Sequence, residues 1–242
     1  MVTKASGNGN APPLHGYRGE AGSAPALIRP RGLTLCINRE AGARGSSVAR
    51  RVGELLGWQV YNQELLGFLA NDDHARNELL ADVPPAAVAW ADNQLIQIHS
   101  DEQQILGPDS EELVRLILIL AARGEAIIVG RGAGSLLPVE TTLNVRIVAP
   151  LDQRIAYMSQ WLRLPLNEAT EEVAARDRIR AALHMGLANR DPADISQYDL
   201  VLNSGRLGEA GCAELIAEAI RGKHLPSDPF ATPSDIPALE PI

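Results

Sequence analysis

Apolar and polar positions along the middle of the chain follow two different periods. Short apolar runs, which are typical of β-strands, occupy residues 33–38, 58–61, 126–129, 143–149 and 198–203. Apolar residues at helical spacing occupy most of the intervals between and after these runs, at residues 46–56, 64–123, 151–162, 170–187 and 207–220. Strands that alternate with helices predict an α/β fold: a three-layer α/β/α sandwich with a five-stranded parallel sheet.

The two ends of the chain differ from this pattern. Residues 1–31 are rich in Gly, Ala, Pro and Ser without an apolar period, which predicts a disordered N-terminal arm. Residues 223–242 contain five prolines and predict a loose C-terminal tail. One domain is therefore expected at residues 32–222, with a helical insert at about residues 63–110 that is interrupted at 84–85 and 107–108.

Three segments are expected to surround one crevice, because ligands bind at the carboxyl ends of the strands in open parallel sheets. They are residues 38–47, 62–64 and 130–134. In the first segment, small residues precede a helix, so backbone N–H groups and the helix N-terminus could converge on an anion. A plain strand-to-helix turn with Ser46 or Ser47 as the N-cap explains the same residues equally well.

The loop departs from the usual phosphate-binding pattern G-x-x-x-x-G-K-[ST]. Laid on the chain without gaps, this pattern puts Arg39 at the first glycine, Arg44 at the second and Gly45 at the lysine. Ser46 falls at the serine or threonine that usually contacts magnesium. The absent lysine is the most serious departure, and the sequence leaves open whether Arg39 or Arg44 replaces its charge.

A series of motifs resembles the cytidylate-kinase-like family in the same order. Residues 37–57 look like the family's opening strand, Ser-Arg-Glu-like triplet, glycine-rich loop and helix ending in Leu-Gly. Residues 61–64 are similar to its Tyr-Asp-Arg-Glu motif, 127–134 to Val-Gly-Arg-Gly, and 198–204 to Tyr-Asp-Leu-x-Ile-Asn-Thr. The resemblance implies a fold of the P-loop nucleoside-monophosphate-kinase type, with a helical lid at about residues 165–195, that uses ATP and Mg²⁺.

The resemblance also implies roles for individual residues. Arg39 and the loop would hold the donor phosphates, and the loop residues are Gly42, Ala43, Arg44, Gly45, Ser46 and Ser47, with Ser46 near Mg²⁺. Arg131 would meet the acceptor phosphate, since a guanidinium pairs with two phosphate oxygens; a salt bridge to a carboxylate is the alternative. Asn62, Gly132 and Asp177 would contact the substrate. Gly132 stands where ordinary cytidylate kinases have an aspartate, so the nucleoside cannot be inherited from them.

The long charged helix after residue 170 resembles the family's lid. Asp177 and Arg180 match its Asp-x-x-Arg, and Arg176 shares a helix face with Arg180. In this reading Arg176 and Arg180 approach the transferring phosphoryl group. The spacing alone is equally typical of a solvated helix in which these arginines pair with acidic neighbours. Residues 189–191 could close the lid, with Arg190 as a further phosphate contact.

Composition excludes several classes of protein. A net charge of -8 argues against a chain-wide grip on nucleic acid. No apolar run reaches the length of a membrane span, the longest being residues 116–122. Cys36 is expected as a buried free thiol, and the absence of a disulfide framework favours the cytoplasm. The histidines have no metal-ligand spacing.

Two principal functions remain open. The first is a kinase that transfers the ATP γ-phosphate to a nucleoside monophosphate (CMP-like) or a similar small phosphorylated acceptor. The second is a catalytically degenerate module that binds a nucleotide or an anion for regulation or interaction. The departures at residues 44, 45, 62 and 63 favour the second. A structural homodimer on the same scaffold is a third reading, with the helical insert as its contact.

Overall fold

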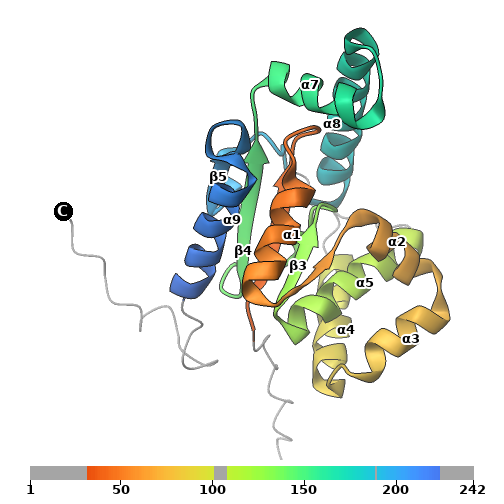
Figure 1. The fold of residues 1–242 in the computed structure, drawn as a ribbon. Coiled ribbons are helices and arrows are strands. Elements are labelled where there is room, and N and C mark those ends of the chain that lie inside the picture. Colours follow the sequence, from red (N-terminus) through yellow and green to blue (C-terminus); the bar gives the residue numbers. More distant parts are fainter. Residues whose placement is uncertain (1–31, 101–107, 189, 224–242) are drawn as a thin grey trace, which may run out of the picture.

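The computed structural model describes residues 32–100, 108–188 and 190–223 (Figure 1). The predicted arm at 1–31 and nearly all of the predicted tail lie outside these residues, as do Asn189 and the break expected at Gly107.

Five parallel strands form one sheet in the order β2-β3-β1-β4-β5. Their bounds are β1 Thr34–Arg39, β2 Gln59–Tyr61, β3 Ala126–Val129, β4 Thr142–Val148 and β5 Leu200–Asn203. The central strand β1 pairs with β3 on one side and with β4 on the other, so that Ile37 lies opposite both Val129 and Val145. The predicted five-stranded parallel sheet is confirmed.

Helices cover both faces of this sheet and stand above its carboxyl edge (Figure 1). The α-helices are α1 Gly45–Leu56, α2 Gln63–Asn71, α3 Asp73–Ala81, α4 Pro85–Ser100, α5 Pro108–Arg123, α6 Ala133–Leu136, α7 Leu151–Leu162, α8 Leu166–Ala188 and α9 Ser204–Gly222. A short 3₁₀ turn, η1, spans Ile195–Gln197. None of the described helices is long and apolar enough to cross a membrane.

Side-chain alternation along the strands divides the core between the two faces. Leu35 and Ile37 point to the layer of α1 and α9, whereas Cys36 and Ile128 point to the layer of α2, α4 and α5. Cys36 is a buried free thiol, as expected, and burial raises its pKa. The apolar run 116–122 is buried within α5 and fills the second layer.

The segment predicted as a helical insert, at about residues 63–110, holds α2, α3, α4 and the start of α5, which continues to Arg123. The break between α2 and α3 escaped the sequence analysis. It occurs at Asp72, whose Oδ1 accepts a hydrogen bond of 2.9 Å from Ala75 N and so caps α3. Trp90 of α4 is 5% exposed and packs in the core of this layer.

Helices α7 and α8 lie above the sheet, and α8 occupies most of the segment predicted as a lid, at about residues 165–195 (Figure 1). They pack on each other through Met158, Ala169 and Val173, and this small cluster includes Ala41 from the loop after β1. This cluster joins α7 and α8 to the loop after β1, which the sequence indicates as a candidate phosphate-binding loop.

Candidate functional site

The first turn of α1 has no side-chain cap. Its N-cap is Arg44, whose backbone is left-handed (φ 57°) and whose side chain makes no capping hydrogen bond. The alternative in which Ser46 or Ser47 caps the helix is therefore wrong; both lie within the first turn, and Ser46 is exposed. N–H groups that no side chain satisfies, together with the helix dipole, favour an anion at this end.

The loop before α1 is held in a fixed shape by Arg154 of α7. Gly42 (φ 77°) has to be glycine, because a Cβ there would lie 2.5 Å from the Arg154 carbonyl oxygen. Arg154 is 8% exposed and donates hydrogen bonds to Ala41 O (3.1 Å) and to Asp177 Oδ2 (2.6 Å). Asp177 Oδ1 in turn accepts from Ala41 N (2.7 Å). Both carboxylate oxygens of Asp177, predicted to contact substrate, thus bind the loop and its support.

Glu40 fastens the same loop to the end of β4. Its Oε2 accepts a hydrogen bond from Ala149 N (3.1 Å) and lies 3.4 Å from Arg154 Nε. Its Oε1 lies 3.9 Å from Arg146 Nη2. Glu40 and Asp177 therefore offset the charges of Arg146 and Arg154. Among the described residues, no carboxylate lies within ion-pair distance of Arg39, Arg131 or Arg180.

Arg39, Arg131 and Arg180 form a group that we call the arginine cluster. The Nε atoms of Arg39 and Arg131 are buried and have no hydrogen-bond partner within the described residues. Arg180 donates a hydrogen bond of 3.3 Å to the carbonyl of Arg39. Burial, reinforced by the charges of Arg180 and Arg131, lowers the pKa of Arg39 to about 10, with Glu64 acting in the opposite direction. Burial also lowers the pKa of Arg180, although Asp177 opposes it.

Arg131 is held in place by unusual backbone geometry. It has a φ of 60° and lies between Gly130 (φ 86°) and Gly132 (φ 62°). A left-handed backbone at an arginine costs on the order of 1 kcal/mol, and such strain is concentrated at functional sites. No ion pair to Arg131 occurs in the described part of the chain, so the salt-bridge alternative finds no support there.

Two other predicted site residues have structural partners. Arg176 pairs with Glu172 (2.6 Å) and lies over the ring of Trp161 at 5.8 Å, as the solvated-helix alternative describes. Asn62 caps α2, because its Oδ1 accepts a hydrogen bond of 2.8 Å from Leu65 N. Their predicted roles toward ligands stay predictions.

Arg44 turns away from the arginine cluster. Its Nη1 lies 3.6 Å from Glu209 Oε1, and its guanidinium lies 4.9 Å from the centre of the Tyr157 ring. It borders a hollow of about 150 Å³ beside the loop, lined by Gly42, Arg44, Ala149, Gln153, Ser204, Gly205 and Gly208. Sequence reasoning gave Gln153 and Ser204 no role, although residue 204 closes the last family motif.

A buried series of polar side chains joins α8 to β1, and the sequence did not predict it. The side chain of His184, 3% exposed, lies with Nδ1 3.3 Å from Asn38 Nδ2 and with Nε2 3.0 Å from Gln197 Oε1. Asn38 Oδ1 accepts a hydrogen bond of 3.1 Å from Arg146. No group of three potential metal-ligating side chains occurs among the described residues.

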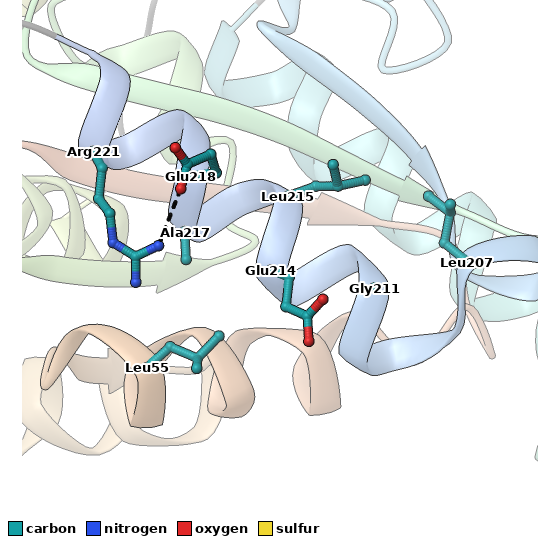
Figure 2. Close-up of a pocket in the computed structure, with 8 residues that line it drawn as sticks. All are labelled: Leu55, Leu207, Gly211, Glu214, Leu215, Ala217, Glu218 and Arg221. Atoms are coloured by element: carbon teal, nitrogen blue, oxygen red, sulfur yellow. Dashed lines mark hydrogen bonds and ion pairs between the residues drawn. The ribbon is translucent and has the colours of Figure 1, made fainter.

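A larger hollow, of about 450 Å³, lies between α1 and α9 (Figure 2). Leu55, Leu207 and Leu215 border it together with Glu214, Glu218 and Arg221. Leu55 is at the end of α1 remote from the phosphate-loop candidate, so this hollow is separate from the arginine cluster.

Several known proteins are similar to this chain in sequence. The cytidylate kinase of Methanopyrus kandleri is 28% identical over 192 residues, which cover 78% of this chain and 93% of that protein. The cytidylate kinase of Methanothrix thermoacetophila is 31% identical over 102 residues, 42% of this chain and 58% of that protein. A uronate isomerase of Corynebacterium glutamicum is 30% identical over 110 residues, but the match spans 21% of that enzyme and 46% of this chain.

A solved structure gives the same architecture. The crystal structure of an uncharacterized protein from Eubacterium ventriosum superposes with a TM-score of 0.56 at 18% identity, over 79% of this chain and 99% of that one. This likeness shows the fold alone. The model of the Cytidylate kinase-like family matches residues 34–206, and together with the relatives it indicates a nucleotide kinase-like function. Since that match covers well over half of the 242 residues, the chain belongs to the Cytidylate kinase-like family.

Proposed function

We propose that this protein is an ATP-dependent phosphotransferase that phosphorylates a nucleoside monophosphate or a similar small phosphorylated acceptor. The observation that carries the proposal is the arginine cluster beside the uncapped N-terminus of α1. Arg39 and Arg131 each keep a buried Nε without a partner in the described chain. A buried guanidinium without an acceptor is unfavourable, and phosphate oxygens are the acceptors that suit its planar fork.

The parts of the site divide between donor and acceptor. The backbone of residues 42–47 and the hollow beside Arg44 would receive the phosphates and the nucleoside of the donor. Arg131, with Gly132 and Asn62 at its side of the crevice, would receive the acceptor phosphate. Arg39 and Arg180 lie with Arg131 and would offset the charge of the transferring group, which is the main task in phosphoryl transfer.

Magnesium fits this site only as a partner of the nucleotide. The described residues hold no cluster of three acidic, histidine or cysteine ligands, and Glu40 and Asp177 are already bonded. The exposed hydroxyl of Ser46 in the first turn of α1 is a suitable single ligand, since Mg²⁺ usually keeps several waters and binds substrate phosphates. When bound, it would neutralise charge on the donor phosphates.

CMP is the first acceptor to test, because two similar proteins are named cytidylate kinases. Gly132 offers no side chain to a nucleoside, so the acceptor panel should include UMP, dCMP and AMP. A homodimer and a cytoplasmic location stay predictions from the sequence.

A coupled assay of ADP release tests the reaction. With ATP, Mg²⁺ and the right acceptor, Arg131→Met should lower kcat by roughly 100-fold or more while ATP still binds. Arg51→Met, a change of an exposed arginine on α1, is the matched control and should leave the rate unchanged. Equal rates for wild type and Arg131→Met would remove Arg131 from the chemistry.

A binding module without turnover is the second candidate. The observation that favours it is Gly45 at the position of the usual lysine, with Arg44 committed to Glu209 and Tyr157 instead. Calorimetric titration with ATP, ADP and CMP separates the two candidates. Tight binding of nucleotide without ADP release across the whole acceptor panel would favour the module.

A further inference from the structure

We propose that Arg39 takes the place of the lysine that ordinary phosphate loops carry, and that residue 45 is glycine because the stem of Arg39 occupies the space of that side chain. The proposal rests on the proposed function, because it assigns the charge that grips the donor phosphates within the same nucleotide site.

Residues 39 and 45 compete for one space. A Cβ built on Gly45 would lie 2.6 Å from Arg39 Cβ and 2.9 Å from Arg39 Cγ. Contacts this short do not occur between real side chains, so any residue larger than glycine at 45 would displace Arg39. The usual pattern has glycine at the first of these positions and lysine at the second; this chain has arginine and glycine. Relative to the usual pattern, the cationic side chain is therefore at residue 39 and the glycine is at residue 45.

The side chain of Arg39 leads from this space into the arginine cluster. Its Nη1 lies against Gly130, where any Cβ would collide with it. Arg131 and Arg180 are close enough to lower its pKa, and its Nε is buried without a partner in the described chain. The guanidinium is therefore held at the carboxyl edge of β3, and its Nε has no acceptor among the described residues.

Arg44, the other arginine of the loop, does not reach this position. Its side chain is 46% exposed, pairs with Glu209 and lies over Tyr157. These contacts direct its charge toward α7 and α9. Arg39 is thus the loop arginine that can supply the missing cation.

Exchange of the two residues tests the proposal. The dissociation constants of ADP, AMP and pyrophosphate are measured by calorimetry for wild type, Arg39→Met, Arg39→Lys, Arg44→Met and the double variant Arg39→Gly/Gly45→Lys. Arg39→Met should weaken ADP and pyrophosphate by about tenfold or more, because a charge-assisted contact is lost. AMP should change by less than about threefold, since the usual lysine reaches the β- and γ-phosphates. The double variant should recover most of the affinity for ADP.

Two further variants keep the test decisive if the double variant does not fold, as judged by circular dichroism. Arg39→Lys should retain part of the affinity for ADP. Arg44→Met, which removes a charge beside the donor hollow, should cost less ADP affinity than Arg39→Met does, and the exposed Arg51→Met should stay within about threefold of wild type. An Arg44→Met loss as large as that of Arg39→Met would overturn the proposal, as would a folded double variant that binds no better than Arg39→Met. If wild type binds neither ADP nor pyrophosphate, the proposed function fails and this assignment fails with it.

Discussion

At the scale of single residues, the site has more arginines than carboxylates that pair with them among the described residues. Glu40 and Asp177 form ion pairs with Arg146 and Arg154. No carboxylate of the described chain lies within ion-pair distance of the arginine cluster, and Glu64 and Asp177 offset its charge only from further away. Buried charges of this kind destabilise the ligand-free protein, and natural sites keep them where a ligand supplies the missing partner. Stability and ligand binding should therefore respond in opposite directions at Arg39.

We expect Arg39→Met to stabilise the ligand-free protein. Methionine keeps most of the stem that packs on Gly45 and removes the unpaired charge, so the free energy of unfolding should rise by roughly 1–3 kcal/mol. The same variant should lose the stabilisation that ADP gives to wild type. Urea unfolding with and without ADP measures both effects.

Arg44→Met is the control for that experiment. It deletes the pair with Glu209 and the contact with Tyr157, so it should leave the free energy of unfolding unchanged or lower it by up to about 1 kcal/mol. If Arg39→Met lowers stability as much as this control does, the charge of Arg39 contributes to the fold and not only to ligand binding.

The sequence predicted these residues unequally. Arg39, Arg131 and Arg180 come from motifs at strand ends and in the lid, and the structure brings them together. Arg176 lies at the same helical spacing as Arg180, yet it turns to Glu172, and spacing alone cannot decide between a ligand and a neighbouring carboxylate. The alternative of a serine cap for α1 is wrong, and nothing in the sequence indicates that Arg44 adopts a left-handed backbone.

At the scale of elements, helix α8 is attached to β1 and the loop after it at three points, one of which is the hydrogen bond from Arg180 to the carbonyl of Arg39. Asp177 binds the backbone of Ala41, and His184, nearly two turns further on, lies against Asn38. Burial lowers the pKa of His184; Arg146 and Arg190 act in the same direction, whereas the hydrogen bond with Gln197 and the charge of Asp191 oppose it. The folded protein therefore favours a neutral imidazole at this junction.

The stability of the protein should consequently depend on pH through His184. Its folded pKa lies below 6.5, so the unfolded chain binds the proton first as the pH falls. The stability that the neutral imidazole contributes is complete above 6.5 and is lost progressively below that value. Urea unfolding between about pH 7.5 and 5.5 should show this decline for wild type and a flatter dependence for His184→Gln. His74→Gln, at an exposed position, should keep the wild-type slope; identical slopes for all three proteins would contradict the prediction.

Element boundaries show what the sequence could and could not specify. The strands were predicted to within two residues because each is a mainly apolar run that is soon followed by glycine, proline or a polar residue. Helix α8 begins at Leu166 rather than at Thr170, because its first turn is exposed and gives no apolar period. The break at Asp72 was missed because the apolar period continues on both sides of it.

At the scale of the whole molecule, the described residues hold two complete cores on the two faces of one sheet. Lys223 adds a tie at the end of α9: its Nζ donates hydrogen bonds to Val139 O (2.9 Å) and to Thr142 O, and lies 3.7 Å from Asp199 Oδ2. The domain expected at residues 32–222 therefore gains a residue that fixes α9 to the start of β4. The boundaries of the folded domain can be tested by truncation.

We expect a chain reduced to residues 32–226 to fold and to bind ADP as the full chain does. Its Tm should lie within about 2 °C of the full-length value, because the cores and the arginine cluster are all retained. Lys223→Met in this shortened chain should lower the free energy of unfolding by about 1–2 kcal/mol, since two carbonyl groups lose a charged donor. Thermal unfolding and calorimetry with ADP measure both quantities. A much lower Tm or a weaker ADP affinity for the shortened chain would mean that residues 1–31 or 227–242 belong to the functional unit. If only Lys223→Met lowers the free energy of unfolding, the domain ends at about that residue.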